Sequence, residues 1–444
     1  MKRNTRMTVL ALGLFAAVIL ATTSCGRDPI FHIIATETAP VPPLIRGGPT
    51  QMVVFNWPMP LEVAMAELEA DGETELESEE EAEPGNGTRP VLFVASGDLF
   101  WYTPARQNND GSWDNTSARW GVDIGITQPP GGRDRRIIDI AATRENLYVL
   151  SMTGTGVSTN IYRWNMNPKR WDLIEFPGSG NIQSVFADPA GGQLFAGEQR
   201  GGVNYIWHLV DGDTALRQLP TDSRLVNEQP VDHTGLLSGV AFSGGSYFLT
   251  TRNGVFQVGR GWLTRDDMAR TFMGMIKLPD DTLIAIARAG GFLYRVNGDS
   301  LELERIPVGD DFMRAGRDVT GALALWYGQD PTGNTRKLLI VGIQGSRHAT
   351  TFTNGYVEFN LRADGSLDTD EPRREAGSTG GLWSVNDTAR YRTSLGRLPI
   401  NHLFQTPWEI DADMTFFAST QTAGLWSYRD LEAGGWQWNA EADN

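Results

Sequence analysis

The sequence predicts an all-β protein, and both its composition and an internal repeat indicate this fold class. The 444 residues include 50 glycines and 14 tryptophans, and 40% of them are hydrophobic. An excess of glycine and aromatic residues over a mostly polar background favours many short strands and turns. Long amphipathic helices are hard to find anywhere after residue 90, although a chain of this length can bury a large core.

The repeat is clearest in residues 147–178, which follow the order strand, loop, strand, turn, strand. Three strands joined by two turns make a meander. The strongest apolar run of this meander begins at Leu147, and we take it as the inner strand of a unit. Seven such runs line up: VLFVAS from Val91, LYVLSM from Leu147, LFAGEQ from Leu194, YFLTTR from Tyr247, LIAIAR from Leu283, LLIVGI from Leu338 and FFASTQ from Phe416.

Each of these runs is followed by a second run that begins with a small or turn residue and carries an aromatic. Several copies also have a preceding apolar strand, such as IIDIAA from Ile137 and LSGVAF from Leu237, which completes a four-stranded unit of roughly 50 residues. A unit of this kind cannot bury its apolar faces alone, so copies must stack around an axis as a β-propeller. The sequence predicts seven blades, with six or eight as alternatives. A β-sandwich or a β-helix would not repeat at this period.

One blade carries a family resemblance. Trp164 and Trp171, in NIYRWNMNPKRWDLIEFP, resemble the turn between the third and fourth strands of a kelch repeat. Glycine pairs at 191–192, 244–245 and 290–291 are also similar to kelch, but they fall in scattered register. The resemblance implies a kelch-like propeller rather than membership of the kelch family. Beside the other copies of the repeat, the two tryptophans are interpreted as blade packing.

Residues 1–25 are typical of an export signal. A basic start precedes an apolar stretch at 9–21, which is too short to span a bilayer comfortably, and Cys25 follows three small residues. This arrangement resembles the lipobox of bacterial lipoproteins, in the looser form of spirochaetes, and implies a lipoprotein signal peptide with lipidation of Cys25. Gly26 stands where an aspartate would retain an enterobacterial lipoprotein at the inner membrane, so we expect the outer membrane. The alternative is an ordinary cleaved signal with an incidental cysteine.

Residues 26–88 are predicted to be a Pro-rich, acidic and disordered tether, and residues 89–444 the propeller domain. Prolines are frequent up to residue 60, and ten carboxylates with no basic residue lie between Glu67 and Glu83. The run MVVFNW at 52–57 is the exception. It either pairs with the folded domain or is a sticky patch in the linker.

The remaining polar residues contain no catalytic motif. The five histidines have no spacing that places two on one face, so a histidine metal site is not expected. VDGDTAL fits the pattern of aspartyl-phosphate phosphatases, but Asp211 and Asp213 fall in a blade turn, where Asp-Gly supplies a positive φ. Asp364, Asp368 and Asp370 lack the mid-loop glycine of an EF-hand, which favours a solvated loop. We therefore expect no catalytic residue, no metal and no cofactor.

The longest interruption of the repeat is the insertion at 361–398. A loop this long inside a compact repeat fold is usually functional or disordered. Arginine and aromatic residues are favoured at protein interfaces, so we hypothesise that the insertion contacts a partner; a mobile insertion without any contact is the alternative. The candidate partner-binding residues are Arg373, Arg374, Trp383, Arg390, Tyr391 and Arg392.

Two classes of function remain. The sequence favours a non-catalytic protein-interaction scaffold or binding module, lipid-anchored in the cell envelope through Cys25. The alternative is a propeller enzyme, a hydrolase or lyase acting on glycans or lactones, whose loop carboxylates would meet at the central channel only in three dimensions. We expect a protein partner in the envelope, no nucleic-acid partner and a monomeric state.

Overall fold

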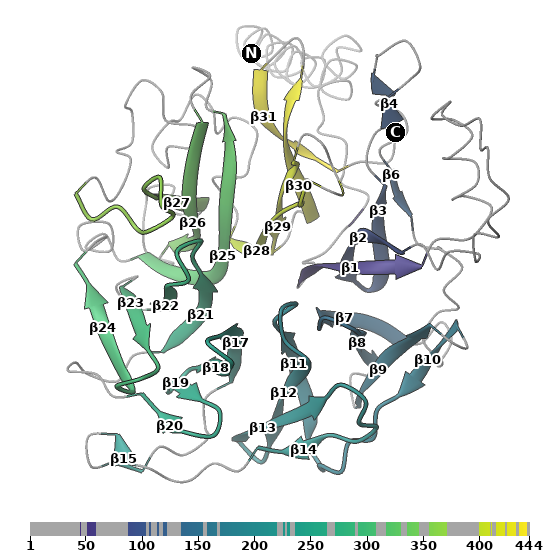
Figure 1. The fold of residues 1–444 in the computed structure, drawn as a ribbon. Coiled ribbons are helices and arrows are strands. Elements are labelled where there is room, and N and C mark those ends of the chain that lie inside the picture. The colour runs from purple at the N-terminus through teal and green to yellow at the C-terminus, as the bar shows by residue number, and fades with distance from the viewer. Residues whose placement is uncertain are drawn as a thin grey trace, which may run out of the picture. The chain divides into compact units, whose positions relative to one another are not determined.

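Seven antiparallel sheets follow one another along the chain and surround a central space (Figure 1). They belong to one unit, residues 43–444. No helix among the described residues is long and apolar enough to cross a membrane. The computed structural model describes residues 45, 51–58, 88–103, 106–107, 113–114, 119–121, 135–153, 158–166, 169–219, 225–226, 229–230, 236–263, 271–288, 292–307, 317–329, 335–345, 355–370, 399–408, 410, 414–421, 424–431 and 435–441.

Each sheet is a blade made of strands that follow one another in the sequence. Blade 1 contains β1 (Met52–Pro58), β2 (Thr88–Ser96), β3 (Asp98–Thr103) and β6 (Arg119–Gly121). Blade 2 contains β7 (Arg135–Ala142), β8 (Leu147–Thr153), β9 (Thr159–Met166) and β10 (Lys169–Leu173). Blade 3 contains β11 (Asn181–Ala187), β12 (Gln193–Arg200), β13 (Val203–Val210) and β14 (Arg217–Gln218). Blade 4 contains β17 (Leu237–Ser243), β18 (Ser246–Thr251), β19 (Gly254–Gln257) and β20 (Gly261–Trp262).

The second half of the ring repeats this plan. Blade 5 contains β21 (Phe272–Lys277), β22 (Leu283–Ala287), β23 (Leu293–Asn297) and β24 (Glu302–Ile306). Blade 6 contains β25 (Arg317–Gln329), β26 (Thr335–Gly345) and β27 (Gly355–Asn360). Blade 7 contains β28 (Ile400–Gln405), β29 (Phe416–Thr420), β30 (Gly424–Leu431) and β31 (Gly435–Ala440). Two small hairpins lie outside the blades: β4 (Arg106–Gln107) with β5 (Trp113–Asp114), and β15 (Leu225–Val226) with β16 (Gln229–Pro230).

The first strand of each blade lies innermost, and this corrects the expected assignment of inner strands. The seven apolar runs of the repeat form the second strands instead, and β22 and β29 are buried at every residue. The first strands β21 and β28 mix buried residues with half-buried ones, because one side of each faces the central space. A strand covered on both faces reads as a continuous apolar run, so the second strands gave the stronger sequence signal.

A separate hydrophobic cluster fills each of the seven interfaces between neighbouring blades. The cluster between blade 7 and blade 1 closes the ring, and the ring centroids of Tyr102 and Phe417 lie 5.3 Å apart in it. Trp120 Nε1 also donates to Glu441 Oε2 across this interface at 2.8 Å. Because the circuit of filled interfaces returns to its start, the described strands form a seven-bladed propeller, and the predicted fold class is confirmed.

Strand β1 falls inside the range 26–88 that was expected to be a tether. It pairs with β2 from Met52, opposite Val94, to Pro58. Trp57 stacks on Trp164 of blade 2 with ring centroids 4.8 Å apart, and it meets Phe93 of its own blade at 5.4 Å. Of the two interpretations of MVVFNW, pairing with the folded domain is therefore confirmed. The propeller takes its first strand from before residue 89, and the boundary placed there is corrected.

The two tryptophans of the kelch-like turn pack inside the propeller. Trp164 and Trp171 are directly opposite one another on β9 and β10, and their rings meet edge to face at 5.3 Å. Both are buried in the cluster that joins blades 1 and 2. Their interpretation as blade packing is confirmed.

Blade 6 has three described strands, and the insertion follows the last of them. Residues 361–370 turn back on themselves, with a bridge between Leu361 and Leu367. Leu367 packs into the cluster between blades 5 and 6, so the first ten residues of the insertion belong to the folded ring. Residues 371–398 lie outside the described part of the chain.

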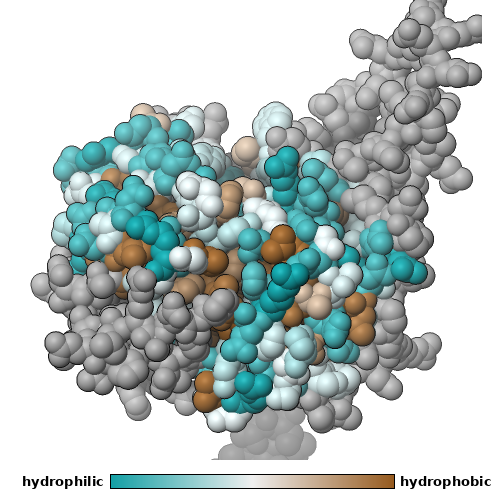
Figure 2. Space-filling model, turned by 60° about the horizontal axis from the view of Figure 1, so that its bottom comes forward, coloured by the Kyte–Doolittle hydropathy of each residue, from teal (hydrophilic) through white to brown (hydrophobic). Residues whose placement is uncertain are grey.

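The surface shown in Figure 2 is mostly hydrophilic, with its hydrophobic residues in separate patches. Among the described residues, the large hydrophobic side chains that are exposed are few. They are Leu173, Val203, Val210 and Trp408, and Trp408 is the most exposed at 63%.

Candidate functional site

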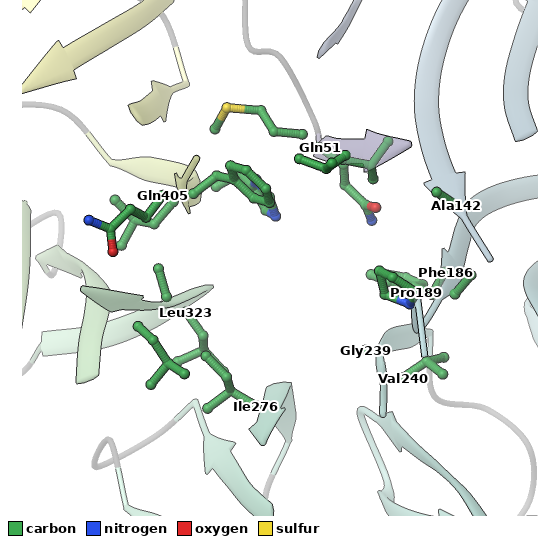
Figure 3. A pocket seen from close by; sticks show the side chains of 18 of the residues that line it. Gln51, Ala142, Phe186, Pro189, Gly239, Val240, Ile276, Leu323 and Gln405 are labelled. Carbon is green, nitrogen blue, oxygen red and sulfur yellow. The ribbon is translucent and has the colours of Figure 1, made fainter. Parts of the chain in front are cut away.

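The candidate site is the channel that the seven first strands enclose. It is a cavity of about 810 Å³, and residues of β1, β7, β11, β17, β21, β25 and β28 all line it. Figure 3 shows labelled side chains from several blades, including Gln51, Ile276 and Gln405, arranged around the open space. Ligand pockets in proteins commonly have volumes of about 300–1,000 Å³. The channel is therefore large enough for a small-molecule ligand.

Most side chains on the channel wall are apolar. They come from different blades, and several of them are half-buried, with one side toward the cavity. A wall of this kind favours apolar contacts over charged ones. The apolar lining includes Val53, Phe186, Val240, Ile276, Leu323 and Phe404.

Three glycines on the wall let neighbouring first strands approach one another closely. A Cβ on Gly239 of blade 4 would lie 3.3 Å from the backbone nitrogen of Met275 in blade 5. A Cβ on Gly274 of blade 5 would lie 3.0 Å from the carbonyl oxygen of Gly321 in blade 6. Backbone therefore meets backbone at this level of the channel, and larger residues would push the blades apart.

His402 is a lining residue with a buried nitrogen that has no hydrogen-bond partner. This nitrogen is Nδ1, and the imidazole ring lies nearly parallel to that of Phe404 with centroids 6.5 Å apart. Burial lowers the pKa of His402 to about 4, because desolvation disfavours the imidazolium. The imidazole is therefore uncharged at neutral pH.

Two glutamines on the wall have structural partners. Gln405 of blade 7 donates to the carbonyl oxygen of Tyr327 at 2.7 Å and accepts from its backbone amide at 2.8 Å, which ties blade 7 to blade 6. Gln51 donates from Nε2 to the carbonyl oxygen of Val185 at 3.3 Å. These amides hold the ring together.

Charged groups are scarce in the channel. No aspartate or glutamate is among the described residues that line it, and its ionisable residues are Arg144, Tyr327 and His402. Arg144 is exposed, and burial raises the pKa of Tyr327. None of the three is fully buried, so this part of the wall does not offer a cluster of buried acids and bases.

Two buried carboxylates of the described chain, Asp139 and Glu198, accept hydrogen bonds away from the channel. Asp139 Oδ2 accepts from the amide of Val185 in the next blade at 3.0 Å. Glu198 accepts from the amide of Gly180 at 2.6 Å and from Trp207 Nε1 at 2.9 Å. A buried carboxylate is retained where such donors satisfy it. These two acids therefore stabilise the ring.

Asp211, the first aspartate of VDGDTAL, lies in the turn between β13 and β14 of blade 3, and its side chain bonds to blade 2. Gly212 has a φ of +94°, which confirms the predicted Asp-Gly turn. Asp211 Oδ1 accepts from Tyr148 Oη at 2.9 Å, from Asn146 Nδ2 at 2.8 Å and from Thr143 Oγ1 at 3.1 Å. Burial and the nearby Asp211 raise the pKa of Tyr148, so its hydroxyl stays a donor. The cluster is a tie between blades.

The acidic residues at the start of the insertion are held by their own loop. Arg362 pairs with Asp370 at 2.9 Å and lies 3.6 Å from Asp368. Asp364 accepts from the backbone amide of Ser366 at 2.9 Å and from its hydroxyl at 2.7 Å. In the described residues, no group of three or more His, Cys, Asp or Glu could hold a metal ion.

Trp408 lies beside the channel, immediately after the lining residue Pro407. Its side chain is 63% exposed although indole rings are usually buried. Exposed tryptophans are enriched in the central residues of protein interfaces. Trp408 and the apolar wall were missed by sequence reasoning, because nothing in the linear sequence shows which residues lie beside the channel.

The candidate residues chosen from the sequence are not tested by this geometry. Cys25 and all six candidate partner-binding residues of the insertion lie outside the described residues. They stay predictions.

No protein-family model and no curated protein matches the chain. Solved structures resemble it at low identity. YCF48 from Cyanidioschyzon merolae is 12% identical with a TM-score of 0.40, over 76% of this chain and 91% of that one. The Cps50 (Swd1) β-propeller domain of Myceliophteria thermophila is 10% identical with a TM-score of 0.39, and the match covers 76% of this chain and 93% of that one. A catalytically inactive virginiamycin B lyase from Staphylococcus aureus, with quinupristin, is 10% identical with a TM-score of 0.34, and the match covers 67% of this chain and 96% of that one.

The depressed pKa of His402 predicts a pH-dependent stability. The folded state binds the proton near pH 4, whereas an unfolded histidine binds it near pH 6.5. The stability that depends on the neutral ring is present above pH 6.5 and is lost as the pH falls toward 4, by at most about 3 kcal/mol. Urea unfolding of the wild type and of His402→Gln at pH 7 and pH 4.5 measures this. The variant should lose less stability on acidification, and equal losses would show that His402 titrates normally.

Proposed function

We propose that this chain is a non-catalytic binding module, a β-propeller that acts as a protein-interaction scaffold in the cell envelope. The observation that supports the proposal is the composition of the channel wall, whose described part contains no carboxylate and is mostly apolar. Glycoside hydrolysis generally uses a pair of carboxylates, and general base catalysis works best with a pKa near the working pH. His402, with a pKa of about 4, is a weak base at neutral pH.

The finer parts of this proposal come from the sequence. A lipid on Cys25 holds the kelch-like propeller at the outer membrane, and the acidic segment around residues 67–83 keeps it away from anionic headgroups. The partner docks at the channel opening beside Trp408, and the arginines and aromatics of residues 371–398 extend the contact.

Site-specific photo-crosslinking in intact cells tests where a partner docks. Trp408 is replaced by p-benzoylphenylalanine, and the matched control carries the same group at Leu173, which is 59% exposed on β10. The proposal expects a discrete protein adduct from position 408 and none from position 173. No adduct at 408, or identical adducts from both positions, would count against a docking site at the channel.

Deletion of residues 371–395 tests whether the insertion contributes to partner binding. This deletion keeps Leu367 in its cluster and leaves β28 intact, so the ring should still fold. The adduct formed at position 408 should become weaker by several-fold. An unchanged yield would remove the insertion from the interface while leaving the rest of the proposal in place.

A further inference from the structure

We propose that the central channel is a binding site for an uncharged, largely apolar small molecule that donates one hydrogen bond to His402. The observations behind this proposal are the cavity of about 810 Å³, its mostly apolar wall and the imidazole of His402 on that wall. The inference goes beyond the proposed function, because a small ligand can fill the channel whether or not a protein docks at its opening.

The electrostatics of the wall determine the charge of the ligand. A charge that leaves water must find a countercharge, or its burial is strongly unfavourable. The described wall offers no carboxylate for a cation, and its imidazole is uncharged at neutral pH. Arg144, the one cation among the described lining residues, is exposed, where an ion pair contributes little. An uncharged ligand avoids these costs.

His402 determines where the ligand needs a polar group. His402 lines the channel with an uncharged imidazole, and a ligand that bonds to it satisfies a polar group on a mostly apolar wall. Its Nδ1 is buried, so a ligand in the channel reaches Nε2, which accepts when the proton is on Nδ1. Gln405 and Gln51 are already bonded to backbone groups. The ligand is therefore anchored by one N–H or O–H group.

Shape contributes the remaining selectivity. The ring of Phe404 lies beside that of His402 at an angle of 19°, and both line the cavity. Leu323 and Ile276 contribute to the wall from blades 6 and 5 (Figure 3). Ligand pockets of this kind hold drug-sized molecules through apolar contacts and use a few polar groups for orientation. A flat or branched apolar body with one donor fits this wall.

A matched pair of fluorescent dyes tests the inference on the folded chain from residue 43. N-phenyl-1-naphthylamine is uncharged, apolar and carries one N–H donor, and 8-anilino-1-naphthalenesulfonate has the same ring system with a sulfonate added. The uncharged dye should bind saturably at one site per chain, and the sulfonated dye at least tenfold more weakly. Equal binding of both dyes, or no saturable binding of the uncharged dye, would overturn the proposal.

Variants place the dye in the channel. Leu323→Trp in blade 6 and Val240→Trp in blade 4 each place an indole ring in the cavity. Each variant should reduce the affinity for the uncharged dye at least tenfold. Leu173→Trp adds the same ring on the outer strand β10 and should leave the affinity unchanged. His402→Phe keeps the apolar wall without the acceptor and should weaken binding several-fold.

Unfolding curves show whether each variant is folded, and two independent filling variants keep the test valid if one of them is not. Full affinity in a folded filling variant would place the dye elsewhere and overturn the inference. Full affinity in His402→Phe would overturn the assigned anchor. The photo-crosslinking result at position 408 does not depend on either outcome.

Discussion

A chain that begins at residue 60 is expected to lose the folded propeller, whereas a chain that begins at residue 43 keeps it. The shorter chain lacks β1, the innermost strand of blade 1, and with it the buried Met52, Phe55 and Trp57. Truncating one such residue to alanine typically costs about 2–5 kcal/mol. Losing three of them, together with every hydrogen bond between β1 and β2, would remove most of the roughly 5–15 kcal/mol that stabilises a typical domain.

The loss should extend to the closure of the ring. Ile45 is completely buried in the cluster between blades 7 and 1, and its carbonyl oxygen accepts from the amide of Leu425 at 3.3 Å. Trp57 contacts Trp164 of blade 2, so the same short segment joins blade 1 to both of its neighbours. Without it, blade 1 would keep only the contacts of its outer strands.

Far-UV circular dichroism and urea unfolding of the two chains measure this effect. Within the longer chain, Trp57→Ala should lower the free energy of unfolding by about 3–5 kcal/mol. Trp408→Ala, at an exposed position, should change it by no more than about 0.5 kcal/mol. Identical unfolding midpoints for the long and short chains would show that β1 is not part of the stable fold.

The sequence was sufficient for the fold because one strand in each blade is buried on both faces. Runs such as LIAIA in β22 are continuous and apolar, so they align across the repeat without any knowledge of pairing. The seven-fold copy number and the packing role of Trp164 and Trp171 followed from that alignment. Strand β1 was ambiguous, because a long acidic stretch separates it from β2 and its pairing partner could not be read from the run MVVFNW alone.

The first strands were harder to recognise because their period is interrupted. The pairing of first and second strands shifts by one residue in five blades, between Ile137 and Asp139 in blade 2 and between Ile400 and His402 in blade 7, for example. An extra residue of this kind reverses the faces of every residue after it, so strict alternation fails. When the first strands are aligned on this shift, His402 of blade 7 takes the same position as Asp139 of blade 2. Sequence reasoning did not attempt this alignment.

The channel itself could not be predicted from local patterns. Val53, Val240 and Leu323 are far apart in the sequence, and they face one cavity only because seven interfaces bring the ring back to its start. The same limit applies to the absence of carboxylates from the described wall. The turn that holds Asp211 and the loop that holds Asp364 were local interpretations, but the position of an acid relative to the channel is a property of the closed ring.

Replacing Gly321 by alanine is expected to lower the free energy of unfolding by about 3 kcal/mol or more. Gly321 has a φ of +92°, and a Cβ there would lie 2.5 Å from the carbonyl oxygen of Met273 in the neighbouring blade. The left-handed backbone alone costs an alanine about 1–2 kcal/mol. The contact adds about 1–3 kcal/mol, because the atom that must move is backbone inside a paired strand.

Gly212 provides a control that separates these two terms. Its φ of +94° is nearly the same, but a Cβ there would meet nothing within 4 Å. Gly212→Ala should therefore cost only about 1–2 kcal/mol, the backbone term alone. Urea unfolding measures both variants. Where their m-values are equal, the difference between the two midpoints gives the difference in the free energy of unfolding. If both variants lost the same stability, blades 5 and 6 could separate slightly at no cost, and the close backbone approach would not fix the spacing of the ring. A larger loss for Gly321→Ala would show that this approach, more than the turn geometry, requires glycine on the channel wall.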